Sequence, residues 1–218
     1  MTVDAIIFDF DGVIIDTETP DFEVWQEFYR EHGLDLSAEL WLTRVGSVNG
    51  TGFDPAAHFE KLTGAHLDST FIKEHFDSYV QRCGQQPVLP GVKELLTMAS
   101  EKGIKLAIAS NSYLDWVERW LRQHTLYKYF DCICTRGDVK QGKPAPDLYL
   151  KAAECLNTSV DCCVAIEDSP FGMEAALAAG IRCIAVPNEL TKYLERPNVA
   201  LTINSLAEYD LAGLLAKF

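Results

Sequence analysis

Positive charge is scarce in this sequence. The 218 residues include 19 lysines and arginines against 32 aspartates and glutamates, which gives a formal net charge of −13. Such a surface repels phosphate backbones and anionic lipid headgroups, and no cluster of basic residues reverses this locally. We therefore exclude nucleic acid and membranes as partners. An anionic substrate would need a site that carries its own positive charge, and a metal ion is the simplest source.

The chain also lacks the apolar run of ~20 residues that a membrane-spanning helix needs. Its first residues, MTVDAIIFDFDG, contain acids and no basic stretch, so they do not resemble a signal peptide. We therefore expect a cytoplasmic protein. No two cysteines have the CxxC spacing of zinc and thioredoxin-like sites. The seven cysteines are expected to be reduced thiols, most of them in the core.

The sequence does contain an alternation of short apolar runs and helical patterns. After a first apolar run, only helical patterns appear, at about 20–33, 38–42, 55–62 and 69–82. Helices then alternate with the runs IKLAIAS, FDCICT, CCVAIED and RCIAVP, which is typical of βαβ units. We therefore predict an α/β protein with a doubly wound, parallel-sheet (Rossmann-like) core of residues 1–15 and 88–218. An all-helical cap domain of residues 16–87 is inserted after the first strand.

Reactive side chains stand where the predicted strands end. Ligands of open α/β sheets bind at the carboxyl ends of the strands, so residues at those ends are expected to share one site. In chain order these residues are Asp9, Asp11, Ser110, Asn111, Lys143, Glu167 and Asp168.

These residue types suit phosphoryl transfer with a magnesium ion. Mg²⁺ prefers carboxylate oxygens, and it would offset the repulsion between Asp9 and the neighbouring acids. Residues i and i+2 of a strand point to the same side. Asp9 can therefore attack a phosphoryl group while Asp11 protonates the leaving oxygen and later deprotonates water. Lys143 supplies a second positive charge, and Ser110 can hold the equatorial oxygens.

Four segments, FDFDGV, IASNS, GKPAPDLY and AIEDSPFGMEAALAAG, resemble the signature motifs of the haloacid dehalogenase-like hydrolase superfamily. The chain is most similar to its β-phosphoglucomutase-like phosphatase branch with a helical cap, over essentially its whole length. The resemblance implies that Asp9 is the nucleophile and a Mg²⁺ ligand. It also implies that Asp11 is the general acid/base, with its backbone carbonyl on the metal.

The same resemblance assigns roles to the remaining strand-end residues. It implies that Ser110 and Asn111 bind the phosphoryl group and that Lys143 neutralises it. Asp168 would hold the metal, with Glu167 as a further ligand or as a partner of the ligands.

Each of these residues also has a purely structural interpretation. Asp9 and Asp11 could be turn residues, Ser110 and Asn111 could cap the next helix, and Asp168 could cap another. Four motifs in the expected order favour catalysis.

The signals in the cap are weaker. Arg44, Ser47 and Asn49 lie in TRVGSVNGTGF, which either faces the substrate or is a solvated loop. We assign Arg44 to substrate binding. His75 is more consistent with a partly exposed helix residue.

We therefore predict a Mg²⁺-dependent phosphatase that acts on a small phosphorylated metabolite through an aspartyl-phosphate, as a monomer or weak dimer. The alternatives are a β-phosphoglucomutase-type sugar phosphomutase and a catalytically idle, phosphate-binding regulatory protein. The mutases place a histidine where this chain has Asp21, and a lysine at or near His75. An acid at residue 21 would repel the second phosphate of a phosphosugar, which favours hydrolysis. Asp21 could also be only a helix-start residue favoured by the helix dipole.

Overall fold

The computed structural model describes residues 3–44 and 52–218. Within these residues a six-stranded sheet has the order β3-β2-β1-β4-β5-β6, and every neighbouring pair runs parallel. Strands β2 and β3 lie on one side of β1, and β4, β5 and β6 lie on the other side. The strand order therefore reverses beside β1. Such a reversal opens a crevice at the carboxyl ends of the strands. The strands are β1 (Ala5–Phe8), β2 (Lys105–Ala109), β3 (Cys132–Cys134), β4 (Cys163–Glu167), β5 (Arg182–Ala185) and β6 (Leu201–Thr202).

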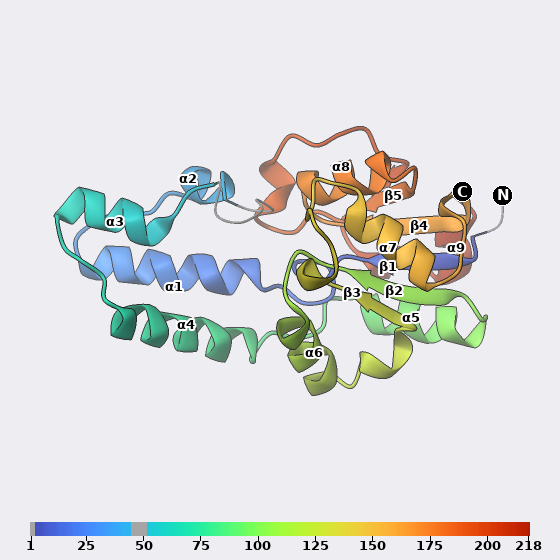
Figure 1. The fold of residues 1–218 in the computed structure, drawn as a ribbon, viewed down its shortest axis with the longest axis horizontal. Coiled ribbons are helices and arrows are strands. Elements are labelled where there is room, and N and C mark those ends of the chain that lie inside the picture. The colour runs from blue at the N-terminus through green and yellow to red at the C-terminus, as the bar shows by residue number, and fades with distance from the viewer. Residues whose placement is uncertain (1–2, 45–51) are drawn as a thin grey trace.

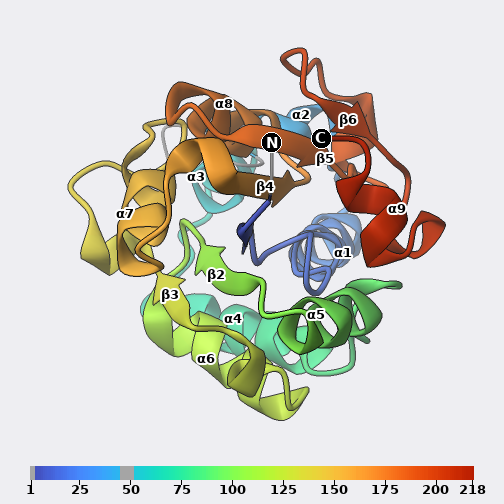
Figure 2. The same cartoon turned by 90° about the vertical axis from the view of Figure 1, so that its right-hand side faces the viewer.

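Helices cover both faces of the sheet, as predicted. One face packs against α5 (Val92–Glu101), α6 (Leu114–Gln123) and α9 (Leu211–Leu215), and the other against α7 (Asp147–Cys155) and α8 (Pro170–Ala178) (Figure 2). The side chains of β1 alternate between these layers: Ile6 and Phe8 join the first, while Ala5 and Ile7 join the second. A strand that is buried on both faces must be apolar throughout, which explains the continuous run AIIF.

The segment between β1 and α5 is helical and lies apart from the sheet, at the end of the molecule opposite the termini (Figure 1). Its helices are α1 (Glu18–Glu31), α2 (Ala38–Leu42), α3 (Pro55–Thr63) and α4 (Ser69–Cys83). They enclose a separate apolar core of Trp25, Tyr29, Leu36, Trp41 and Phe59. We refer to these four helices as the cap. Ser47 and Asn49 lie outside the described residues.

The two passages of chain that join the cap to the sheet run side by side. Ile15 forms an antiparallel bridge with Val88, and the N–H of Leu89 donates to the carbonyl of Ile14 at 2.9 Å. This pairing lies next to the expected boundaries at 15/16 and 87/88, which remain a prediction.

The expectation that all cysteines are reduced is wrong for two of them. Cys132 in β3 and Cys155 at the end of α7 form a disulfide, with their Cα atoms 6.3 Å apart, within the usual range for such bonds. Helix α7 packs on β3, so two residues 23 positions apart in sequence meet there. Cys83, Cys134 and Cys183 are free thiols, as expected.

None of the helices in the described part of the chain is long and apolar enough to span a membrane.

Candidate active site

The turn after β1 brings the first motif to the carboxyl edge of the sheet. The N–H of Asp9 donates to the carbonyl of Ile166 at 2.9 Å, so Asp9 continues the pairing of β1 with β4. Gly12 follows with a φ of +81°, and a Cβ at this position would lie 2.4 Å from Oδ2 of Asp168. Residue 12 must therefore be glycine, both for its backbone conformation and to leave room for that carboxylate.

Lys143 lies between two buried carboxylates. Its Nζ is 2.6 Å from Oδ1 of Asp9 and 2.6 Å from Oε1 of Glu167. Tyr149 on α7 donates its hydroxyl to the same Oε1 at 2.7 Å. Burial alone would lower the pKa of Lys143, but attraction to Asp9 and Glu167 outweighs it and raises the pKa. The ammonium group therefore stays charged, and Glu167 holds it beside Asp9.

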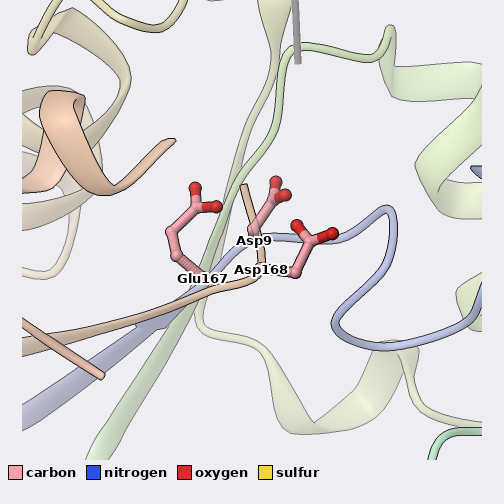
Figure 3. Close-up of side chains that lie close together, drawn as sticks. All are labelled: Asp9, Glu167 and Asp168. Carbon is pink, nitrogen blue, oxygen red and sulfur yellow. The ribbon is translucent and has the colours of Figure 1, made fainter. Parts of the chain in front are cut away.

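Three buried carboxylates gather where β1 and β4 end (Figure 3). One oxygen from each of Asp9, Glu167 and Asp168 lies within 4.8 Å of the others. Burial raises the pKa of Asp9 to about 7, with repulsion from Glu167 adding to the shift and attraction to Lys143 opposing it. Burial and repulsion from Asp9 also raise the pKa of Asp168 well above its ordinary value. The cluster thus holds more negative charge than one lysine offsets.

A divalent cation fits this donor set, because it would relieve the repulsion and it prefers carboxylate oxygens. Asp9 and Asp168 are better placed to hold it than Glu167, because both carboxylate oxygens of Glu167 already accept hydrogen bonds. The donors are Lys143 and Tyr149 for one oxygen and Ser169 for the other. Asn188, which follows β5, donates from Nδ2 to Oδ2 of Asp168 at 2.8 Å. Such a contact orients a metal-binding carboxylate.

Asn111 positions the backbone around Lys143. Its Oδ1 accepts from the N–H of Lys143 at 2.8 Å, and its Nδ2 donates to the carbonyl of Lys143 at 3.3 Å. A Cβ at Gly142 would lie 2.4 Å from that Oδ1, which explains the glycine before the lysine. Ser110, at the end of β2, is buried and accepts from the N–H of Ser112 at 3.0 Å.

The carboxylate of Asp11 accepts hydrogen bonds from three elements. Thr17, just before α1, donates to Oδ1 at 2.7 Å, and Ser112 donates to Oδ2 at 2.6 Å. The indole Nε1 of Trp116 on α6 donates to Oδ1 at 2.9 Å. Asp11 is therefore held between the sheet edge and the cap.

One pocket of about 660 Å³ extends from the sheet edge to the cap. Of the site residues predicted from the sequence, all of which the structure describes, Glu167 alone does not line it. Those that do are Asp9, Asp11, Arg44, Ser110, Asn111, Lys143 and Asp168. The structure thus brings the predicted residues from both parts of the chain to a single cavity.

On the cap side, Arg44 is paired with an acid. Its Nη2 lies 3.1 Å from Oδ2 of Asp21 on α1, and its guanidinium carbon lies 4.7 Å from the ring centre of Trp41. Glu18 and His75 line the same end of the pocket. Arg44 therefore lines the pocket with its Nη2 paired to Asp21, while its Nη1 has no hydrogen-bond partner within the described residues.

Sequence reasoning missed several residues of the site. Asn188 directly follows the run RCIAVP, so the search of strand ends would have found it had that strand been included. Trp116 and Tyr149 have helical apolar spacing and were indistinguishable from core residues. Only the fold shows that their polar atoms reach Asp11 and Glu167.

The parallel sheet, the carboxylates at its edge and the buried lysine define a hydrolase of a known type. Residues 6–186 match the family model described as haloacid dehalogenase-like hydrolase, and the chain belongs to this family.

Relatives of known name share most of the chain. YhcW of Bacillus subtilis, whose name describes a proposed phosphatase, is 39% identical over 216 residues, covering 98% of this chain and 96% of that protein. The phosphorylated carbohydrates phosphatase of Thermotoga maritima is 31% identical over 191 residues, covering 84% of each. A crystal structure of a mutant of CbbY from Rhodobacter sphaeroides, in complex with xylulose-(1,5)bisphosphate, has a TM-score of 0.78 and 28% identity. That match covers 98% of this chain and 99% of the other. With the family, these relatives identify the chain as a phosphoric monoester hydrolase.

Proposed function

We propose that this protein is a Mg²⁺-dependent phosphatase that hydrolyses a small phosphorylated metabolite through an aspartyl-phosphate on Asp9. The observation that carries the proposal is the contact of the buried Lys143 with Asp9, beside Asp168, at one end of a pocket of about 660 Å³. The names of relatives support the substrate class, since one acts on phosphorylated carbohydrates and another was crystallised with a sugar bisphosphate.

Asp9 is the nucleophile in this mechanism. Lys143 holds Oδ1, while Oδ2 accepts no hydrogen bond within residues 3–44 and 52–218, so Oδ2 is the oxygen that attacks phosphorus. The bond from phosphorus to the leaving oxygen breaks as the bond to Asp9 forms. Lys143 and Ser110 offset the charge on the transferring group. A magnesium ion held by Asp9, Asp168 and the backbone carbonyl of Asp11 would supply the charge that lets a carboxylate approach a phosphate dianion.

Asp11 transfers the protons. It lies between the phosphate end and the cap end of the pocket, where the leaving oxygen would sit. In the first step it gives a proton to that oxygen, and in the second it takes one from water. The water attacks phosphorus, which releases phosphate and restores the carboxylate of Asp9.

We also propose that residues 16–87 form a cap domain that moves against a core of residues 1–15 and 88–218. The paired passages at Ile15 and Val88 would be the hinge, and closure would exclude bulk water from the pocket. The separate apolar core of the cap supports its movement as one body.

Phosphate release from p-nitrophenyl phosphate tests the proposal. We expect activity with Mg²⁺, none after EDTA treatment, and recovery when Mg²⁺ is restored. Asp9→Asn should abolish turnover without changing the circular dichroism spectrum, because an amide is a poor nucleophile. Asp168→Ala should raise the Mg²⁺ concentration for half-maximal activity by ~10-fold or more.

A matched control is Asp161→Asn, which removes an exposed carboxylate at the opposite end of β4 and should change neither quantity. Full activity in EDTA, or inactivity towards p-nitrophenyl phosphate with Mg²⁺ present, would contradict the proposal.

Two alternatives remain distinguishable by experiment. A sugar phosphomutase would convert β-glucose 1-phosphate into glucose 6-phosphate, given a trace of the 1,6-bisphosphate, faster than it releases phosphate. The pairing of Asp21 with Arg44 argues against this, since it places an acid where the second phosphate would bind. An idle phosphate-binding protein would release no phosphate from any substrate.

A further inference from the structure

The cap end of the pocket carries more negative than positive charge. Burial raises the pKa of Glu18 and keeps this residue protonated at neutral pH, so the described charged residues of this end are the acids Asp21 and Asp115 and a single cation, Arg44. The undescribed segment 45–51, VGSVNGT, contains no charged residue and cannot change this balance. A ligand that reaches past the phosphate therefore meets an excess of carboxylates.

The one cation is already paired with an acid through Nη2, while its Nη1 has no hydrogen-bond partner within the described residues. Arg44 donates to Asp21 at 3.1 Å, and the Asp21 side chain is 16% exposed. A phosphate that contacts Arg44 also comes close to the carboxylate of Asp21, so repulsion from Asp21 offsets attraction to Arg44.

His75 does not replace the missing positive charge. Burial and repulsion from Arg44 lower the pKa of His75 to about 4, so the imidazole is neutral at physiological pH. Its ring lies 3.9 Å from the ring of Trp25, which also lines the pocket. His75 is thus part of an aromatic wall.

The same wall favours another kind of ligand. Trp25, Tyr79 and Trp116 line the pocket, and the rings of Tyr79 and Trp116 stack at 5.2 Å. Aromatic faces pack against the C–H faces of hydroxylated molecules and attract cations. The carboxylate of Asp115 and the carboxyl group of Glu18 accept hydrogen bonds from hydroxyl or amino groups.

We propose that the substrate is a monophosphate whose leaving group is hydroxylated or amino-bearing and has no second phosphate, and that the Asp21–Arg44 ion pair excludes bisphosphates. The proposal rests on the phosphatase activity proposed above. It sets this protein apart from CbbY, which was crystallised with a sugar bisphosphate. Specificity here comes from an unfavourable contact with the wrong ligand as much as from contacts with the right one.

Competitive inhibition tests this inference without requiring that the probes are turned over. Fructose 1-phosphate and fructose 1,6-bisphosphate are compared as inhibitors of p-nitrophenyl phosphate hydrolysis, at constant ionic strength and with Mg²⁺ in excess. The wild type should bind the monophosphate at least ~10-fold more tightly, because like charges placed together oppose binding. Asp21→Asn should free Arg44 and reduce this ratio by ~10-fold or more.

A control variant and a double variant distinguish an effect of the Asp21–Arg44 pair from a general effect of removing negative charge. Glu23 lies on the same helix as Asp21, does not line the pocket and pairs with Arg82. Glu23→Gln should therefore leave the ratio of the two inhibition constants unchanged. Adding Arg44→Gln to Asp21→Asn should restore the preference for the monophosphate, because no cation then remains at this end.

Three results would overturn the inference: tighter wild-type binding of the bisphosphate, an unchanged ratio in Asp21→Asn, or absence of inhibition by fructose 1-phosphate. Each can occur in an enzyme that hydrolyses p-nitrophenyl phosphate. Failure of the inference is therefore distinct from failure of the phosphatase proposal, which would show as no hydrolysis at all.

Discussion

Glu18 stands at the start of α1 with its carboxyl group in the pocket and other acids nearby. Burial and repulsion from Asp21 and Asp11 raise its pKa to about 8, against an ordinary value of 4.5. The folded protein therefore keeps a proton on Glu18 over a pH range in which the unfolded chain loses it. Ionisation of Glu18 therefore makes the folded protein less stable as the pH rises.

We predict that Glu18→Gln stabilises the metal-free protein in a pH-dependent way. Below pH 4.5 the carboxyl group is protonated in both states, so the variant should match the wild type. Between pH 4.5 and 8 the wild type loses stability relative to the variant, and above 8 the difference is constant. Because the side chain is partly open to the pocket, we expect a difference on the order of 2 kcal/mol.

Urea unfolding in EDTA at pH 4.5 and pH 8.5 measures this difference. Glu31→Gln, at the exposed opposite end of α1, is the control. Its free energy of unfolding should differ from that of the wild type by the same amount at both pH values. A Glu18→Gln effect that is the same at both pH values would contradict the assignment of the shift to this carboxyl group.

The sequence could predict which residues gather at the site, but not how they pair. Asp9, Lys143 and Asp168 were predictable because each stands at or after the end of a strand, and parallel strands end at one edge. The contacts of Lys143 with Glu167 and of Asp21 with Arg44 depend on side-chain directions that the fold sets. No spacing pattern in the sequence specifies them.

Among the elements, α6 has the most direct effect on the chemistry. It follows the motif IASNS and carries Trp116, whose indole donates to Asp11 and whose ring stacks on Tyr79 of the cap. One helix therefore contacts both the proposed acid/base and the part of the molecule expected to move. Trp116 is a positioning residue, because it acts through Asp11.

We predict that Trp116→Phe weakens proton transfer more than it weakens binding. The substitution keeps an aromatic ring but removes the N–H donor, so Asp11 is less firmly held. For substituted phenyl phosphates, kcat should fall ~10–100-fold with poor leaving groups and only about 3-fold with p-nitrophenolate, which needs little protonation. KM should change little across the series.

Trp120→Phe is the matched control on the same helix. The indole nitrogen of Trp120 has no hydrogen-bond partner within the described residues, and Trp120 does not line the pocket. Its substitution should not change the dependence of kcat on the leaving group. An equal loss across all leaving groups in Trp116→Phe would show that the residue has only a structural role.

The long elements were predictable because their apolar periodicity is regular over whole turns or whole strands. Helices α3 and α4 and the central strands lie within a few residues of their predicted positions. The strand β6 was missed, since two residues carry too little pattern, and α9 was missed although the equally short α2 was predicted. The two missed elements are stabilised by their contacts with the rest of the fold: β6 pairs with β5, and α9 packs against α5.

At the scale of the whole molecule, this acidic chain places two cations, Lys143 and Arg44, in the lining of one pocket. Lys143 is placed at the phosphate end of the pocket and Arg44 at the cap end, each paired with a carboxylate. With a net charge of −13, the protein can bind an anion only where such a cation, or a metal ion, is held in place. We propose that the protein selects its substrate by charge through this distribution.

The disulfide between Cys132 and Cys155 shows where sequence reasoning fails at this scale. The two residues belong to different elements, and neither has a spacing typical of a paired cysteine. Their contact depends on how α7 packs on β3, which is a property of the assembled layers.

The central claim is that Asp9 carries the phosphoryl group, and a single turnover in labelled water, combined with trapping of the phosphorylated enzyme, tests it most directly. Enzyme in excess is allowed a single turnover of a phosphate monoester in water labelled with ¹⁸O. The phosphate and the peptide that contains Asp9 are analysed by mass spectrometry after this single turnover. A parallel sample is analysed in the same way after many turnovers. The account predicts unlabelled carboxylate in Asp9 and one labelled oxygen in the phosphate from the single turnover, because water attacks phosphorus of the aspartyl-phosphate.

A covalent intermediate must also be visible in that experiment. Rapid quenching in acid should trap a phosphorylated peptide containing Asp9, and Asp9→Asn should yield none. The same labelled phosphate without any phosphorylated Asp9 peptide would mean that water attacks the substrate directly, and would contradict the account.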